Sequence, residues 1–122
     1  MSNVRSFALV IALALSSVTA RAQANPEVWR RSYALEAQGN SREALTTLES
    51  LPEDARRSYI YTLRRAWLLY LVGRFDDSAA AYQQAAAASP NAVEPRVGGL
   101  LPLMAQRRWQ DAERLARDVL RM

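Results

Sequence analysis

The chain has 122 residues, half of them hydrophobic, with 16 basic residues that are all arginine, 12 acidic residues, and no histidine or cysteine. This length supports one small core, and the absence of lysine, histidine and cysteine excludes Ser-His or Cys-His nucleophile pairs, Schiff-base lysines and imidazole or thiolate metal sites. Most enzyme classes are therefore excluded, and we expect no catalytic residue, no cofactor and no metal.

Residues 1–24 have the three-part layout of a secretory signal peptide. Arg5 supplies a positive charge, residues 7–15 are almost wholly apolar, and the small residues that follow suit cleavage after Ala22 or Ala24. The apolar stretch falls short of the roughly 20 residues that a membrane-spanning helix needs, so we expect membrane contact only through an uncleaved leader. The sequence predicts an exported protein of the bacterial periplasm.

Beyond the leader, residues 25–122 carry 14 arginines and 12 acidic residues, a net charge of +2. Several arginines come in pairs, such as Arg30 with Arg31, and acidic residues lie between these pairs. Proteins that bind nucleic acids instead gather basic residues on one face. We therefore interpret the charges as solvated helix surfaces with local ion pairs, and we expect no nucleic-acid partner.

A constant spacing recurs through this part of the chain, since Gly39, Gly73 and Arg107 follow one another at intervals of 34 residues. We term this spacing the repeat period. When the three residues are aligned, seven further triplets fall into register. They are Trp29, Leu63 and Val97; Ser32, Ala66 and Leu100; Tyr33, Trp67 and Leu101; Leu35, Leu69 and Leu103; Ser41, Phe75 and Trp109; Ala44, Ser78 and Ala112; and Leu48, Tyr82 and Ala116. Apolar residues recur every three or four positions, so each unit is predicted to be a pair of helices. The predicted units are about 25–58, 59–92 and 93–122.

The first helix of each unit is predicted to end at the aligned position. Gly39 and Gly73 tolerate the left-handed backbone that reverses the chain there. Because Arg107 stands at this position in the third unit, we expect that turn to be wider or strained. Pro52 is expected to shorten the second helix of the first unit and to open the following helix as a first-turn proline, and Pro90 to end the second unit.

These residues resemble the tetratricopeptide repeat (TPR) family, whose pattern has small residues in both helices, a glycine before the turn, an aromatic residue two positions later and a closing proline. Residues 59–92 match best, through Ala66, Leu69, Gly73, Phe75, Ser78, Tyr82, Ala85 and Pro90. The resemblance, to exported bacterial members, implies an all-α fold. It would be an α-solenoid of about three TPR-like helix-turn-helix repeats in residues 25–122, preceded by the signal peptide.

In proteins of this family the first helices line a concave groove that holds a peptide or a helix of a partner protein. The groove positions map here to Trp29, Tyr33, Leu63, Trp67, Tyr70, Leu101 and Met104, with Ile60 less central. The resemblance implies a partner segment that is apolar or mixed, because aromatic anchors dominate interface energetics. The alternative is that these side chains mainly pack between adjacent helices of the chain itself.

A variant of the family grips the C-terminus of a peptide with lysines in the groove, and this chain has no lysine. Arg30, Arg64 and Arg65 could replace that charge, but their position beside the apolar stripe predicts exposure to solvent. Acidic tails are therefore not the expected ligands.

The last helix is expected over about residues 110–122, with Leu115, Ala116, Val119 and Leu120 on one apolar side. Helical arrays normally end in a polar capping helix, because a bare apolar end promotes association. Three alternatives stay open: self-association through this helix, docking on a partner, or continuation into a longer protein. Bacterial export porins, in which periplasmic repeats precede an outer-membrane barrel, are a fold-level example of the last.

The expected function is that of a non-enzymatic interaction module or scaffold of the periplasm. The rival is a hydrolase with paired carboxylates, for which Asp76 with Asp77 and Glu53 with Asp54 are the only adjacent acids. Acid-base catalysis needs two carboxyls opposed across a cleft, whereas neighbours on a helix point in different directions. A helix array on a membrane surface would require a larger basic face than the charge pattern shows.

Overall fold

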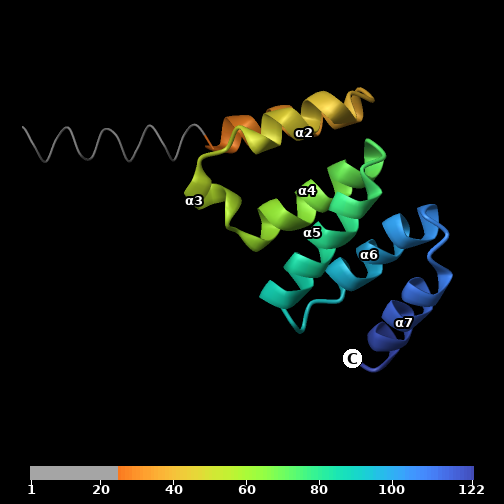
Figure 1. Ribbon diagram of the computed structural model, residues 1–122. Helices are drawn as coiled ribbons and strands as arrows, with labels where there is room; N and C mark the ends of the chain where they lie inside the picture. The colour runs from red at the N-terminus through yellow and green to blue at the C-terminus, as the bar shows by residue number, and fades with distance from the viewer. Residues whose placement is uncertain (1–24) are drawn as a thin grey trace, which may run out of the picture.

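The computed structural model describes residues 25–122, and every regular element in this range is a helix (Figure 1). A helix over residues 25–37 is followed by α2 (Ser41–Glu49), α3 (Glu53–Arg56), α4 (Tyr59–Leu71), α5 (Phe75–Ala88), α6 (Glu94–Ala105) and α7 (Trp109–Leu120). The predicted all-α class is confirmed. The predicted signal peptide, residues 1–24, lies outside the described residues. No helix among those described combines the length and the apolar character needed to cross a membrane.

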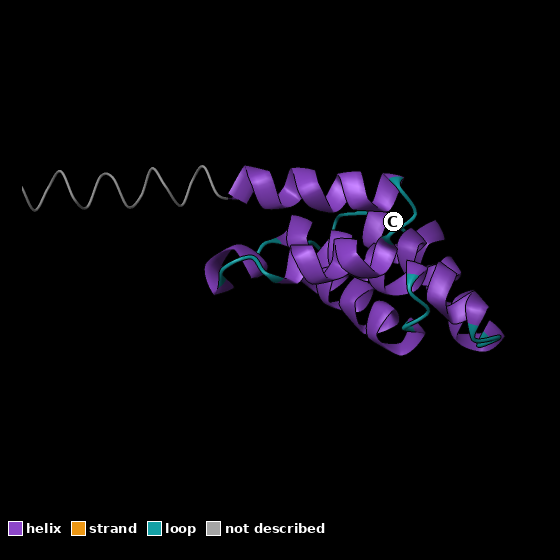
Figure 2. Cartoon of the chain, turned by 90° about the horizontal axis from the view of Figure 1, so that it is seen from above, coloured by secondary structure: helices purple, strands orange, loops and turns teal. Residues whose placement is uncertain are grey.

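The longer helices form three hairpins that follow one another through the molecule (Figure 1). The hairpins pair the 25–37 helix with α2, α4 with α5, and α6 with α7. Neighbouring hairpins join where α4 packs on α2 and where α6 packs on both α5 and α4. The one-turn helix α3 packs on α4, and Figure 2 shows that the remaining connections are short loops. The first helices of successive hairpins therefore lie next to one another.

The same turn closes all three hairpins. Gly39 and Gly73 have a φ of +81°, and Arg107 has a φ of +57°. A backbone hydrogen bond of the Schellman type completes each turn, from Asn40 N to Leu35 O, from Arg74 N to Leu69 O and from Arg108 N to Leu103 O, all 2.9 Å long. The third turn therefore has the same length as the others. It is strained at Arg107, because a residue with a Cβ disfavours left-handed backbone.

Pro52 lies directly before the next helix, as predicted, but at its N-cap rather than in its first turn, and that helix is only the one-turn helix α3. The long helix α4 begins separately at Tyr59. Ser58 is extended, with φ −74° and ψ 148°, which interrupts the helical path between α3 and α4. Its hydroxyl accepts the backbone N–H of Tyr61 at 3.2 Å and so caps α4. The serine cap, rather than the proline, determines where the long helix starts.

Serine hydroxyls join the two helices in the first two hairpins. Ser32 Oγ donates to the backbone oxygen of Ala44 at 2.9 Å, and Ser78 Oγ donates to that of Ala66 at 2.7 Å. All four residues are fully buried. The two pairs occupy equivalent positions, one repeat period apart, but the hydroxyl lies on the first helix in one hairpin and on the second helix in the other. Only small side chains allow the helix backbones to approach this closely.

The junction between the second and third hairpins depends on glycine in α6. A Cβ on Gly98 would lie 2.4 Å from Cε1 of Tyr82, and one on Gly99 would lie 3.4 Å from the Tyr82 Cβ. The tyrosine, only 5% exposed, thus fills the space that a side chain at Gly98 would need. Burial raises the pKa of the Tyr82 phenol to about 12, and the nearby Tyr70 adds to this effect.

Replacing Arg107 by glycine is expected to stabilise the fold by about 1 kcal/mol, because left-handed backbone costs a residue with a Cβ roughly this much relative to glycine. The Arg107 side chain is exposed, so little packing is lost. Urea denaturation measures the change. Adding a Cβ in the second turn, by Gly73→Ala, is expected to lower the free energy of unfolding by a similar amount. A free energy of unfolding that stays the same or falls for Arg107→Gly would contradict the strain.

Candidate binding surface

The seven residues predicted to line a groove lie on the first helices of the three hairpins. Trp29 and Tyr33 lie on the 25–37 helix, Leu63, Trp67 and Tyr70 on α4, and Leu101 and Met104 on α6. Tyr33, Met104 and Leu101 are exposed, by 54%, 49% and 37%. The other four are partly buried, and Trp29, Leu63 and Trp67 also pack against the core. The set thus divides into side chains free for contact and side chains that also hold the hairpins together.

Aromatic rings form two groups, one on the 25–37 helix and one on α4. Trp29 stacks on Tyr33 with ring centroids 6.5 Å apart, and Trp67 meets Tyr70 at 5.7 Å. Tyr70 in turn contacts Phe75 at the start of α5, at 5.9 Å. These separations are typical of favourable aromatic pairs, so each group is a preorganised apolar surface.

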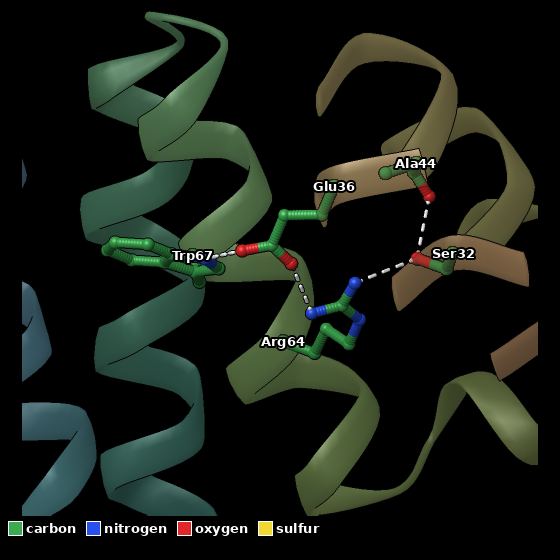
Figure 3. A network of polar contacts seen from close by, with 5 residues as sticks. All are labelled: Ser32, Glu36, Ala44, Arg64 and Trp67. Atoms are coloured by element: carbon green, nitrogen blue, oxygen red, sulfur yellow. Dashed lines mark hydrogen bonds and ion pairs between the residues drawn. The ribbon is translucent and has the colours of Figure 1, made fainter. Parts of the chain in front are cut away.

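A polar network connects the two groups (Figure 3). Glu36 accepts the indole N–H of Trp67 through Oε1 at 2.6 Å and a guanidinium N–H of Arg64 through Oε2 at 2.8 Å. Arg64 also donates to Ser32 Oγ at 3.1 Å, and its guanidinium carbon lies 3.6 Å from the centre of the Tyr33 ring. One carboxylate on the 25–37 helix therefore orients a tryptophan and an arginine on α4, and the arginine covers a tyrosine on the first helix.

The prediction that Arg64 is exposed to solvent is wrong. Its side chain is 6% exposed and forms an ion pair with Glu36, because the two helices bring together residues 28 positions apart. Arg30 is exposed, as expected, whereas Arg65 is 28% exposed and pairs with Glu49 of α2 at 3.0 Å. Sequence reasoning missed the role of Glu36. The available signal was an acidic residue three positions after Tyr33, on the otherwise apolar side of that helix.

Two clefts open between the second helices of successive hairpins, and sequence reasoning did not predict them. The larger, of about 620 Å³, lies among α5, α6 and α7, and the smaller, of about 530 Å³, lies among α2, α3, α4 and α5. Their linings correspond at a shift of one repeat period, for example Tyr61 with Pro95 and Arg65 with Gly99. None of the seven predicted groove residues lines either cleft. Equivalent junctions therefore leave equivalent spaces on the side of the second helices.

The two pairs of adjacent acids lie in the first turns of α5 and α3. Asp77 accepts an N–H of Arg74 at 2.9 Å, and Glu53 forms an ion pair with Arg57. Acidic residues in a first turn interact favourably with the positive end of the helix dipole. The contacts of these acids thus stabilise the beginnings of their own helices.

Replacing Glu36 by alanine is expected to destabilise the fold by about 3 kcal/mol, because a buried guanidinium that loses its carboxylate keeps the full cost of desolvation. Urea denaturation followed by circular dichroism measures the loss. Glu27→Ala is the matched control, since its ion pair with Arg30 is 70% and 71% exposed. We expect that change to cost at most about 0.5 kcal/mol. Equal effects of the two substitutions would contradict the structural role of Glu36.

No known family model matches the sequence, and no curated protein matches it significantly.

Proposed function

We propose that residues 25–122 form a non-enzymatic protein-protein interaction module of the TPR type. It binds an apolar or mixed segment of a partner protein on the first helices of its three hairpins. Turns of the same type spaced by one repeat period, and hydroxyl contacts at equivalent positions of two hairpins, support the relation to this family. The proposed binding surface consists of Tyr33, Trp67, Leu101 and Met104, which we term the first-helix face.

The observation that carries the proposal is that large apolar side chains stand at corresponding positions of neighbouring helices, with Tyr33 and Leu101 exposed and Trp67 partly buried. Tyr33, Trp67 and Leu101 follow one another at the repeat period, and Met104 lies one helical turn after Leu101. Tyr33 and Met104 keep about half of their surface exposed, at 54% and 49%. Exposed apolar side chains gathered on one side of a protein are typical of interaction sites, and rigid aromatic rings bind at low entropic cost.

The contacts of the arginines bear on the chemistry of the partner. Arg64 lies over the ring of Tyr33, and both Glu36 and Ser32 accept its hydrogen bonds. It is therefore committed to the fold rather than free to receive the carboxylate of a peptide. Exposed rings and aliphatic chains are left as the contact groups, which favours a partner segment with an apolar side.

Photo-crosslinking in the producing bacterium tests the proposed surface. A photoreactive amino acid replaces Tyr33 or Met104 and, as matched controls, the exposed residues Thr46 of α2 and Gln83 of α5. We expect the first two positions to crosslink to the same envelope protein and the control positions not to. Mass spectrometry identifies the product. Crosslinking that is equal at all four positions, or that occurs only from Thr46 and Gln83, would contradict binding at the first-helix face.

The proposed location in the periplasm rests on the leader-like residues 1–24. Expression of the full chain in bacteria, followed by fractionation, is expected to place the protein in the periplasm. Mass spectrometry of the intact protein is expected to show an N-terminus at Gln23 or Asn25, because small residues before these positions suit the signal peptidase. A protein that retains Met1 and stays in the cytoplasm would refute the proposed export.

A further inference from the structure

Exposed apolar side chains are concentrated in the last hairpin. Of the ten exposed large hydrophobic residues in the described part of the chain, seven lie at position 93 or later. On α7 these include Trp109, 58% exposed, and Leu120, 86% exposed. Ala116 lies between them on the same side of the helix, since the three residues are spaced by seven and four positions. We term Trp109, Ala116 and Leu120 the end face.

The repeat period shows what covers the corresponding side chains elsewhere. The end-face residues are equivalent to Phe75, Tyr82 and Ala86 of α5, and α6 packs on α5 so closely that Tyr82 is only 5% exposed. Within residues 25–122, no further helix takes the place on α7 that α6 takes on α5. The centre of the end face, Ala116, is thus at a position that the next helix covers in the preceding hairpin.

We propose that the end face is covered by α7 of a second copy of this chain, in an antiparallel arrangement around a two-fold axis that crosses the end face at the level of Leu115 along the helix. Such an axis places Trp109 of one copy next to Leu120 of the other, because these residues lie at opposite ends of the helix. Ala116 lies close to the axis, where its small side chain lets the two helices approach. The same three residues thus serve both copies.

The charges beside the end face favour this occupant. Glu113 and Arg117 lie on one flank of the apolar stripe and form an ion pair of 2.6 Å within the helix, with side chains 62% and 65% exposed. In an antiparallel pair the same flanks of both helices meet. At the level of Leu115 along the helix, the axis lies midway between the two charged residues, so Glu113 of each copy faces Arg117 of the other. The surface is therefore complementary to itself in charge.

The end face is on α7, and the first-helix face is not part of it, so this inference can fail or hold without the proposed function. A contact made by one helix from each copy is small, and small interfaces are typical of weak association. We expect a dissociation constant on the order of 10 µM, within reach of sedimentation equilibrium between about 1 and 500 µM. The full chain is expressed in bacteria, and the protein is purified with or without residues 1–24, according to how the host processes it.

The wild-type protein is expected to change from monomer to dimer over this concentration range. Leu120→Glu is expected to raise the dissociation constant roughly tenfold or more, because the apolar side chain of Leu120 no longer contributes to the contact. Ile60→Glu, at a residue of α4 that is 56% exposed, is the matched control and should leave it unchanged. A wild-type protein that stays monomeric, as expected if another partner or further chain covers α7, overturns the proposal. Equal effects of the two substitutions overturn it as well.

Charge exchange tests the antiparallel contact itself. Glu113→Arg and Arg117→Glu are each expected to weaken the dimer at least tenfold, since every copy then carries like charges on the meeting flank. An equimolar mixture of the two variants is expected to associate as well as the wild type or better. Neither variant regains the ion pair within its own helix, so recovery in the mixture reports a contact between copies.

The matched control uses Glu53 and Arg57 of α3, an ion pair of the same spacing and similar exposure. Glu53→Arg and Arg57→Glu change the net charge in the same way, but they should leave self-association unchanged, alone and mixed. Circular dichroism confirms that every variant keeps its helices. A mixture of the α7 variants that remains monomeric, or an α3 pair that behaves like the α7 pair, would overturn the antiparallel dimer.

Discussion

The fold depends on how closely the two helices of a hairpin can approach, because each amphipathic helix buries its apolar side only against other helices. At the point of approach in the first two hairpins, a serine hydroxyl of one helix donates to a backbone carbonyl of the other. A larger side chain there would separate the backbones and break the bond. The left-handed turns at Gly39 and Gly73 set the register that brings these small residues opposite each other. Turn and contact therefore act together, and both recur with the same period.

The Glu36 network shows how this packing also prepares a surface. A buried ion pair adds little net stability, since desolvation offsets much of the attraction. Its effect here is on orientation. Glu36 binds the indole of Trp67 and the guanidinium of Arg64 at the same time, and Arg64 lies against the ring of Tyr33. Rings from two hairpins are thus fixed relative to each other, so the partner segment that we propose would not have to order them on binding.

The hairpins and their turns could be predicted from the sequence because they follow from local rules: glycine at left-handed positions, apolar residues at helical spacing and a fixed period. The period even located the third turn, where Arg107 gives no glycine signal. Arg64 could not be placed in this way, since its position relative to solvent is determined by Glu36 on another hairpin. The clefts are equally nonlocal, because each is a space between second helices that are separated in sequence by a first helix.

Corresponding positions in successive hairpins carry side chains of different size, and this determines what each junction can accept. The second helices have Leu48, Tyr82 and Ala116 at one such position. Between the second and third hairpins, the large Tyr82 side chain packs against Gly98. Between the first and second hairpins, the residues at the equivalent positions are the smaller Leu48 and the larger Arg64. A large side chain on one helix is thus matched by a small one on the next. Ala116 offers no bulk, so in the proposed dimer a second α7 can approach closely at the middle of the end face, while the larger Trp109 and Leu120 side chains meet at its two ends.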